Sequence, residues 1–351
     1  MASWQDCVRR VTPYVPGEQP KQTDIIKLNT NENPYPPAPG VKKILEEYPA
    51  EHLRRYPDPA ATELVNALAA CYGVKPSQVF AGVGSDDVLA MAFLTFFNSD
   101  RPILFPDITY SFYDVWAELF RIPYRKIPLE DDFRVVPEDY DAENGGIIIA
   151  NPNAPTGLAL PLSGIERILF ANRDVPVIVD EAYVDFGAES ALPLLEKYDN
   201  LLVVQTFSKA RSMAGMRIGF CIGGEEMIAC LNDVKYSINS YTLNSLTVAA
   251  GAEAVRDEAY FRETASKIIE TREWAKEELV KLGFSFPDSK TNFIFASHES
   301  VPAKEIFKAL REAHIYVRYF EKPRIDNYLR ITVGTREEME KFFSFLREYL
   351  K

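Results

Sequence analysis

Short apolar runs alternate with stretches of helical spacing over the first two thirds of the chain. Each run is rich in Ile, Val or Leu and is bounded by Pro, Gly, Asn or Asp, as is typical of strands buried on both faces of a sheet. The runs are RPILF at 101–105, GGIIIA at 145–150, VPVIVD at 175–180, LLVVQT at 201–206 and RIGFCIGG at 217–224. Their spacing predicts βαβ units, and therefore an α/β fold with a mainly parallel sheet and helices on both sides.

Two helices are predicted before the first of these runs. TELVNALAACYG, at 62–73, has apolar residues at helical spacing and stops at Gly73. SDDVLAMAFLTFF, at 85–97, predicts a second helix with Ser85 or Asp86 as its cap.

The chain changes character after about residue 240. A long charged helical stretch at 258–283 leads into short apolar runs at 292–296, 313–320 and 328–335, which together predict a smaller α+β domain. Residues 12–40 are rich in Pro and Asn and predict irregular chain. We therefore expect an N-terminal arm at 1–40 that packs on the small domain and on a partner, a large domain at 41–240 and a small domain at 241–351.

Composition and charge exclude several classes of protein. The net charge of −12 disfavours a general nucleic-acid binder, which needs a basic surface. The four cysteines show no CxxC spacing and the three histidines are scattered, so we expect no metal site and a reducing compartment. No stretch approaches the roughly 18 apolar residues of a membrane span. The first ten residues carry charges where a signal peptide needs its apolar region, which favours the cytoplasm.

Unusual residues gather where the predicted strands end. Asp180 closes one buried run and Tyr183 follows it, while Lys209 lies in the TFSKA segment after the next run. AGVGSDDVLA leads from a glycine loop into a helix N-terminus, which can bind an anion. Taken singly, such residues are helix caps, turn residues or surface charges. Their shared place at the carboxyl ends of strands predicts one ligand site.

These segments resemble those of a known family. The matching segments are KLNTNENPYPP at 27–37, RRYPDP at 54–59, GVGSDD at 82–87, PDITYSFY at 106–113, NPNAPTG at 151–157, VDEAYVDF at 179–186, TFSKARSMAGMRIGF at 206–220 and LRITVGT at 329–335. With them the chain resembles the fold-type I pyridoxal-phosphate enzymes, and most closely the histidinol-phosphate aminotransferases. The resemblance implies a large cofactor-binding domain with a seven-stranded type of sheet.

The resemblance also implies catalytic roles. Lys209 would hold pyridoxal 5′-phosphate as an internal aldimine and later shuttle a proton between the substrate and the cofactor. Asp180 would face the pyridine nitrogen and keep it protonated. Tyr183 and an asparagine of NPNAPTG would hydrogen-bond the ring oxygen O3′. Because Ala154 stands where the family usually has that asparagine, Asn151 and Asn153 remain candidates, and Asn153 is favoured.

The same resemblance assigns the remaining cofactor contacts. Tyr110 would stack on the cofactor ring. Tyr56 would reach the phosphate from the neighbouring subunit, which implies a homodimer with shared sites. The residues expected around the phosphate are Gly84, Ser85, Asp86, Thr206, Ser208 and Arg217. Of these, Asp86 is expected to cap the helix or orient a hydroxyl, because an acid would repel the phosphate.

On the substrate side, Arg330 matches an arginine that binds a carboxylate, and Arg318 would be its neighbour in the anion site. Such a pair suits both glutamate and histidinol phosphate, because a guanidinium pairs with carboxylate and phosphate alike. Tyr14 and Asn31 would close over the substrate from the arm.

The resemblance therefore implies a homodimeric aminotransferase that moves an amino group between glutamate and imidazole-acetol phosphate, in histidine biosynthesis. Aromatic amino-acid aminotransferases and threonine-phosphate decarboxylases share the scaffold and remain alternatives. A non-catalytic cofactor-binding module is a third, disfavoured by the net charge and by the lack of room for a DNA-binding segment before residue 20.

Overall fold

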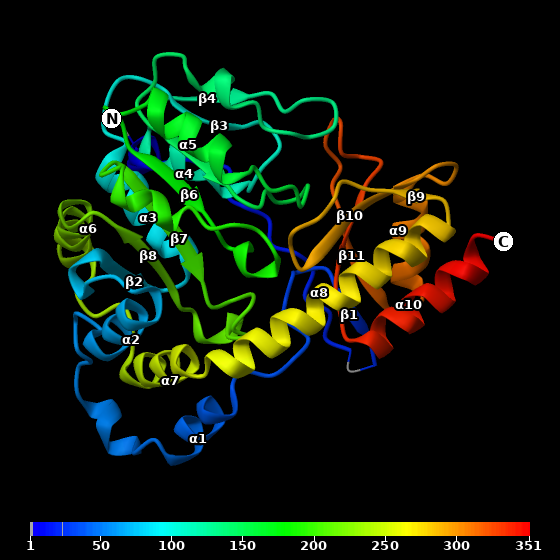
Figure 1. Cartoon of the computed structure of the whole chain (residues 1–351), viewed down its shortest axis with the longest axis horizontal. Coiled ribbons are helices and arrows are strands. Elements are labelled where there is room, and N and C mark those ends of the chain that lie inside the picture. The colour runs from blue at the N-terminus through cyan, green and yellow to red at the C-terminus, as the bar shows by residue number, and fades with distance from the viewer. Residues whose placement is uncertain (1–2, 23) are drawn as a thin grey trace.

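The computed structural model describes residues 3–22 and 24–351. Its larger sheet has seven strands in the order β2-β8-β7-β6-β5-β3-β4 (Figure 1). These strands are β2 (Val79–Gly82), β3 (Ile103–Pro106), β4 (Tyr124–Ile127), β5 (Ile147–Ala150), β6 (Val177–Asp180), β7 (Leu201–Thr206) and β8 (Gly219–Gly223). Neighbouring strands pair in parallel except around β8, which is antiparallel to both β2 and β7. The predicted mainly parallel sheet is confirmed.

Helices cover both faces of this sheet. One face packs against α3 (Ser85–Phe96), α4 (Phe112–Phe120) and α6 (Glu225–Ile238). The other packs against α2 (Thr62–Tyr72), α5 (Leu162–Ala171) and α7 (Ser245–Arg256), and α1 (Pro39–Glu47) packs on α7. In β6, Ile178 points into the first core, whereas Val177 and Val179 point into the second. Burial on both sides explains why the strands read as continuous apolar runs.

The smaller sheet has the strand order β1-β11-β12-β10-β9. Its strands are β1 (Ile26–Leu28), β9 (Phe284–Ser285), β10 (Phe293–His298), β11 (Ile315–Tyr319) and β12 (Leu329–Thr332). The helices α8 (Glu258–Lys281), α9 (Ala303–Glu312) and α10 (Arg336–Tyr349) share a core with it. Figure 1 shows α8 running from the larger unit to the smaller one.

Short 3-10 helices occupy several connections. They are η1 (Trp4–Cys7), η2 (Ala50–Arg54), η3 (Pro76–Gln78), η4 (Pro137–Tyr140), η5 (Val184–Phe186), η6 (Leu192–Glu196) and η7 (Ala214–Met216). Of these, η5 follows β6 and η7 precedes β8, so both lie close to the expected site.

The division between the two units differs from the boundaries expected from sequence. Val248 and Val255 of α7 pack in the core that contains Leu64 and Leu68 of α2, so α7 belongs to the large unit. The division therefore lies near Asp257 instead of residue 241, because the change in composition at 240 marks a surface loop and not the end of a core. Part of the expected arm is also regular, since β1 pairs in parallel with β11.

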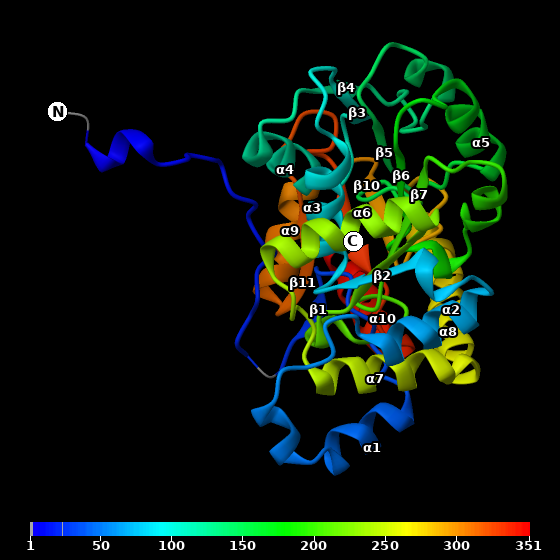
Figure 2. The same cartoon turned by 90° about the vertical axis from the view of Figure 1, so that its left-hand side faces the viewer.

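The segment before β1 begins away from the body. Figure 2 shows η1, drawn in blue, standing apart from both sheets near the start of this segment. Its apolar side chains Trp4 and Val15 are 74% and 73% exposed, so this chain does not cover them. Packing of the arm on a partner remains a prediction.

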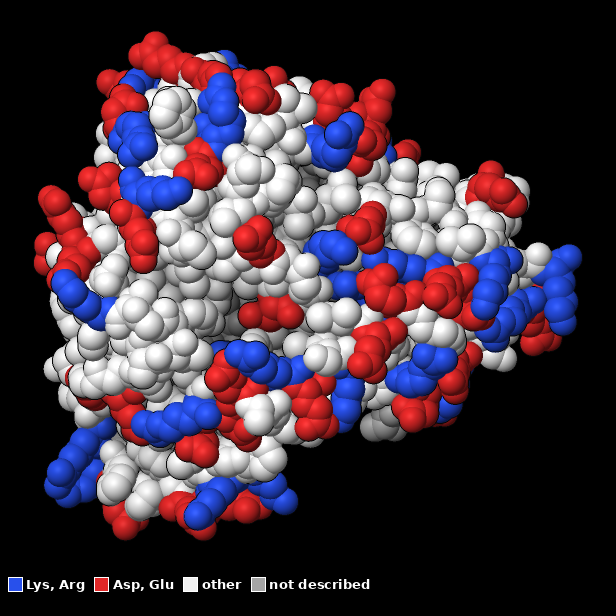
Figure 3. Space-filling model, viewed as in Figure 1, with Lys and Arg blue, Asp and Glu red and all other residues white. Residues whose placement is uncertain are grey.

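Basic and acidic side chains are mixed across the face drawn in Figure 3, where they do not separate into a basic surface. Within residues 3–22 and 24–351, no helix is long and apolar enough to cross a membrane.

Candidate active site

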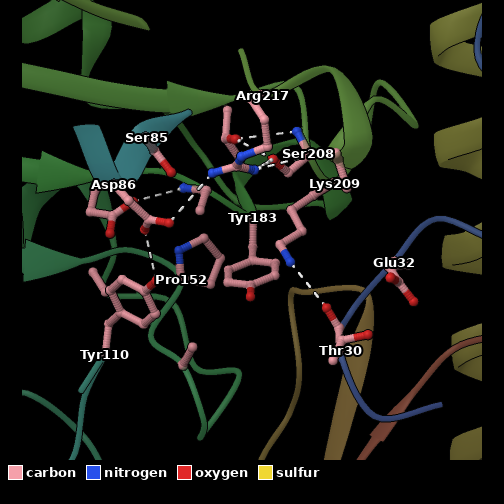
Figure 4. A pocket seen from close by; sticks show the side chains of 16 residues that line it. Thr30, Glu32, Ser85, Asp86, Tyr110, Pro152, Tyr183, Ser208, Lys209 and Arg217 are labelled. Carbon is pink, nitrogen blue, oxygen red and sulfur yellow. Dashed lines mark hydrogen bonds and ion pairs between the residues drawn. The ribbon is translucent and has the colours of Figure 1, made fainter. Parts of the chain in front are cut away.

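Lys209 lies in the turn after β7, beside a cavity of about 190 Å³ between the two units. Its Nζ donates to the Thr30 carbonyl at 3.2 Å and lies 5.7 Å from the centre of the Tyr183 ring. Figure 4 shows the amine reaching toward the cavity from one side, with Asp86 and Tyr110 on the other. The fold therefore holds this lysine in a half-buried position in place of the solvated surface that most lysines occupy.

Asp180 ends β6 and is 5% exposed at the inner wall of the cavity. Its Oδ2 accepts from the Tyr113 hydroxyl at 2.8 Å, and its Oδ1 accepts from the backbone N–H of Ala182 at 3.2 Å. Burial raises the pKa of Asp180 to about 6, although both hydrogen bonds act to lower it. A cation placed against this carboxylate would favour its ionised form.

The N-terminus of α3 and the first residue of β8 form an anion cradle. Gly84 has φ +84°, and a Cβ there would lie 2.4 Å from Nη2 of Arg217. A Cβ on Gly219 would lie 2.2 Å from the backbone nitrogen of Ser85. Only glycine at both places lets the backbone amides and the guanidinium converge. Together with the helix dipole, this arrangement favours a phosphate.

Hydroxyl groups complete the cradle. The Thr206 hydroxyl donates to Oγ of Ser208 at 3.1 Å, and Arg217 Nη1 lies 3.5 Å from that same Oγ. Ser85, Thr206, Ser208 and Arg217 all line the cavity.

Asp86 orients a hydroxyl in this structure. Its Oδ1 accepts from the Tyr110 hydroxyl at 2.8 Å, and its Oδ2 lies 3.6 Å from Arg217. Burial, together with Asp86, raises the pKa of Tyr110 well above its usual value, so this phenol stays protonated. Tyr110 is thereby fixed with its ring at the cavity wall (Figure 4).

The structure does not bring Asn153 to the cavity. Its Nδ2 donates to the Ile108 carbonyl at 2.9 Å and to Thr156 at 3.0 Å, and its Oδ1 accepts from Thr109 at 2.7 Å. The side chain is 3% exposed and holds its own turn together. Ala154, which has no polar side chain, lines the cavity in its place. Asn151 is also engaged elsewhere, with both backbone groups of Leu160.

Asn31 likewise does not line the cavity. It is 1% exposed, and its Nδ2 donates to the Tyr183 hydroxyl oxygen at 2.8 Å. Tyr14 stacks on Phe112 with ring centres 4.3 Å apart, and it lines a second cavity that it shares with Arg318. The two expected arm residues therefore have different surroundings.

Arg318 and Arg330 are register partners on β11 and β12. Nη2 of Arg330 donates to the Asn29 carbonyl at 3.1 Å, while its Nε is buried and has no hydrogen-bond partner within the described residues. Burial lowers the pKa of Arg330 from its usual value, and Arg318 adds to that effect. Two guanidinium groups side by side, one with an unused donor, favour an anionic ligand.

Tyr56 lies outside the cavity of its own chain. Its side chain is 81% exposed and stacks on Tyr241 with ring centres 4.5 Å apart.

Sequence reasoning missed two residues of the site. Tyr113, which holds Asp180, lies in the quoted PDITYSFY segment, three residues after Tyr110, and only the fold shows which tyrosine points at the carboxylate. Glu32 lines the cavity and is bound by Lys27. Although burial acts to raise it, the bonds from Lys27 and Thr30 hold the pKa of Glu32 below its usual value.

The sequence profile of the family described as aminotransferase class I and II matches residues 23–346. The chain belongs to this family. Within it, the histidinol-phosphate aminotransferase of Lactococcus lactis subsp. cremoris (strain MG1363) is 55% identical over 349 residues, covering 99% of this chain and 98% of the relative. The histidinol-phosphate aminotransferase of Brachyspira hyodysenteriae is 51% identical over 347 residues, with coverage of 99% and 98%.

A solved family structure shares the fold. The crystal structure of histidinol-phosphate aminotransferase from Sinorhizobium meliloti in complex with pyridoxal-5′-phosphate superposes with a TM-score of 0.84 at 24% identity, covering 93% of this chain and 90% of that chain. The predicted fold-type I aminotransferase architecture is therefore confirmed.

Proposed function

We propose that this chain is a histidinol-phosphate aminotransferase that uses pyridoxal 5′-phosphate. It transfers an amino group between glutamate and imidazole-acetol phosphate, giving 2-oxoglutarate and L-histidinol phosphate. The observation that carries the proposal is the cavity that sets the Lys209 amine among Asp180, Tyr183 and Arg217. The names of relatives more than half identical to this chain supply the substrate.

The residues present fit the cofactor. Ser85, Ser208 and Arg217 would hold its phosphate, because they surround the α3 N-terminus where two glycines leave space for an anion. Asp180 would face the ring nitrogen, since its carboxylate is the buried acid of the cavity wall. When bound, the cofactor acts as an electron sink for negative charge at the substrate α-carbon.

Lys209 has two tasks in this proposal. Its amine would hold the cofactor covalently, and when free it would carry a proton to and from the substrate. The Thr30 carbonyl accepts from Nζ at 3.2 Å, and this contact places the amine at the edge of the cavity.

Arg318 and Arg330 would bind the anionic end of each substrate in turn. Glutamate brings a carboxylate and L-histidinol phosphate brings a phosphate. A guanidinium offers donors spaced for either group. The unpartnered Nε of Arg330 is a donor that such an anion would satisfy.

We further propose a homodimer with shared sites in a reducing, cytoplasmic setting. Tyr56 is exposed and does not line the cavity of its own chain. It would reach the cofactor phosphate in the cavity of the second subunit. All four cysteines are free thiols, as such a setting favours.

Reductive trapping tests the proposal. Borohydride reduction of the cofactor-loaded protein, followed by peptide mass mapping, is expected to place the cofactor mass on Lys209. Lys209→Ala is expected to bind the cofactor reversibly and to form no glutamate from L-histidinol phosphate and 2-oxoglutarate. Cofactor mass on another lysine, or full turnover by Lys209→Ala, would refute it. Lys290→Ala, a change at a surface lysine paired with Asp288, serves as the control.

A further inference from the structure

The Tyr183 hydroxyl group is hydrogen-bonded by Asn31. The family resemblance implied that Asn31 closes over the substrate and did not predict this contact. Asn31 approaches it from the segment after β1, 152 residues earlier in the chain, and donates from Nδ2 to the phenol oxygen. A phenol has one donor and can accept more than one hydrogen bond. Because Asn31 occupies an acceptor position, the Tyr183 proton must point elsewhere.

The orientation of the Asn31 amide is fixed by Thr332 on β12. The Thr332 oxygen accepts from the backbone N–H of Asn31 at 3.0 Å, so its own proton is free to go to Oδ1 of Asn31, also at 3.0 Å. An amide whose oxygen accepts this bond turns its NH₂ group to the opposite side, where Tyr183 lies. Asn292 adds a donor to the Asn31 carbonyl at 3.0 Å.

The backbone supports the same arrangement. Asn31 has φ +55°, a left-handed conformation that asparagine tolerates better than most residues. It is also 1% exposed. A buried side chain in an unusual backbone conformation, with every polar atom committed, is held in one orientation.

Neither Asn153 nor Ala154 offers a second side-chain hydrogen-bond donor to the cavity beside Tyr183. Asn153 is committed to its own turn, and Ala154 carries no donor. Within the described residues, no side chain or backbone carbonyl accepts the Tyr183 proton. The Tyr183 ring lines the cavity next to Lys209, so the cavity is where the proton can be used (Figure 4).

We propose that Asn31 is a positioning residue that fixes the direction of the Tyr183 hydroxyl, so that its proton is donated to the cofactor's ring oxygen. The order of donation runs from Thr332 to Asn31, from Asn31 to Tyr183, and from Tyr183 into the cavity. Thr332 belongs to the smaller sheet. That sheet therefore fixes the direction of the Tyr183 hydroxyl group, which donates to the cofactor in this proposal. This inference rests on the proposed function, which places the cofactor in this cavity.

The test is the pH midpoint of the absorption band of lysine-bound cofactor. A donor to the ring oxygen stabilises the form in which the linking nitrogen has lost its proton, because the ring oxygen then carries more negative charge. Removing the donor therefore raises the midpoint. Tyr183→Phe is expected to raise it by about one pH unit, the size of one hydrogen bond. Asn31→Gly, which keeps the left-handed backbone unstrained, is expected to raise it by at least about half as much.

The double variant Asn31→Gly/Tyr183→Phe separates positioning from structural support. Its midpoint is expected to equal that of Tyr183→Phe, because Asn31 acts only through the phenol. Thr332→Val is expected to shift the midpoint in the same direction. Asn29→Ala, a change to a nearby buried asparagine bound to the Glu18 carbonyl, is expected to leave it in place. The charged residues that line the cavity beside Lys209 are unchanged throughout; they are Glu32, Asp86, Asp180 and Arg217.

Two results would overturn the inference. One is an Asn31→Gly midpoint equal to that of the unmodified protein, even if its melting temperature falls. The other is an Asn31→Gly shift of equal size with and without the phenol. Absence of any band in the unmodified protein with added pyridoxal phosphate would instead refute the proposed function.

Discussion

Burial governs the behaviour of Asp180. Its carboxylate lies at the end of a strand in which each residue is enclosed, and its pKa is raised from 3.8 to about 6. The folded protein without cofactor therefore binds a proton at this site in a pH range where the unfolded chain has released it. By linkage, that proton stabilises the fold at low pH, and the stabilisation is lost as the pH rises through about 4 to 6.

This predicts a pH-dependent difference between two cofactor-free proteins. As pH rises from about 4 to 7, the free energy of unfolding of the unmodified protein should fall by up to about 3 kcal/mol relative to Asp180→Asn. Urea unfolding at a series of pH values measures it, and the difference between the two proteins cancels the contribution of surface acids. A difference that does not change with pH would show that Asp180 is not desolvated.

The anion cradle depends on the close contact between β8 and the N-terminus of α3. β8 passes so close to the start of α3 that the Gly219 Cα has no space for a methyl group. β8 runs antiparallel to both of its neighbours, β2 and β7. This direction brings its first residue, Gly219, against the N-terminus of α3.

Gly219→Ala should therefore weaken cofactor binding while leaving the fold intact. The added methyl pushes the α3 N-terminus away from Arg217, and we expect at least about a tenfold rise in the Kd for pyridoxal phosphate. Fluorescence titration of the cofactor-free protein measures it. Gly224→Ala, just after the C-terminal end of β8, is the matched control, since the nearest atom to its added methyl group would be 3.5 Å away. Equal affinity of the two variants would contradict the account.

The order of strands and helices could be predicted from sequence because buried strands and helix ends carry local signals. The shared position of Lys209, Asp180 and Ser85 at one cavity could be predicted because each lies just after a strand or at the start of a helix. The roles of Asn31 and Tyr113 could not, because each depends on a contact between distant segments. Asn31 meets Tyr183 and Thr332 across 152 and 301 residues. The sequence favours Asn153 because Ala154 stands where the family usually has an asparagine, but in the structure local turn contacts hold the Asn153 amide.

The two units of the molecule are tied together by the loop between β11 and β12. Arg324 of this loop pairs with Asp107, after β3, at 3.1 Å. It also donates to the carbonyls of Leu129 and Glu130 at 2.9 and 2.7 Å. The same loop follows Arg318 and precedes Arg330, so this link fixes the two arginines proposed to bind substrate relative to the cavity beside Lys209.

Arg324→Ala should raise the KM for both substrates by about three- to tenfold with little change in the cofactor band, because an interface ion pair with two further bonds is lost. Steady-state kinetics and the absorption spectrum measure the two effects. Lys304→Ala removes an exposed ion pair with Glu321 inside the small unit and is the control. An unchanged KM, or loss of the cofactor band, would contradict a role in placing the substrate arginines.

Shared sites in a dimer predict complementation between two defective chains. Lys209→Ala lacks the amine, and Tyr56→Ala lacks the residue proposed to serve the second subunit. Refolding the two together should give hybrids with one site that has both residues, and hence activity above that of either variant alone. Activity that stays at the sum of the separate variants would show that each site is built from one chain.

The half-reaction with L-histidinol phosphate tests the central claim most directly. The cofactor-loaded protein is mixed with this amine alone, and the absorption spectrum is followed. We predict that the band of lysine-bound cofactor converts to that of the aminated cofactor and is restored by 2-oxoglutarate. If the band does not change with L-histidinol phosphate but changes with phenylalanine, the proposed substrate is contradicted. The fold and the role of Lys209 would still stand.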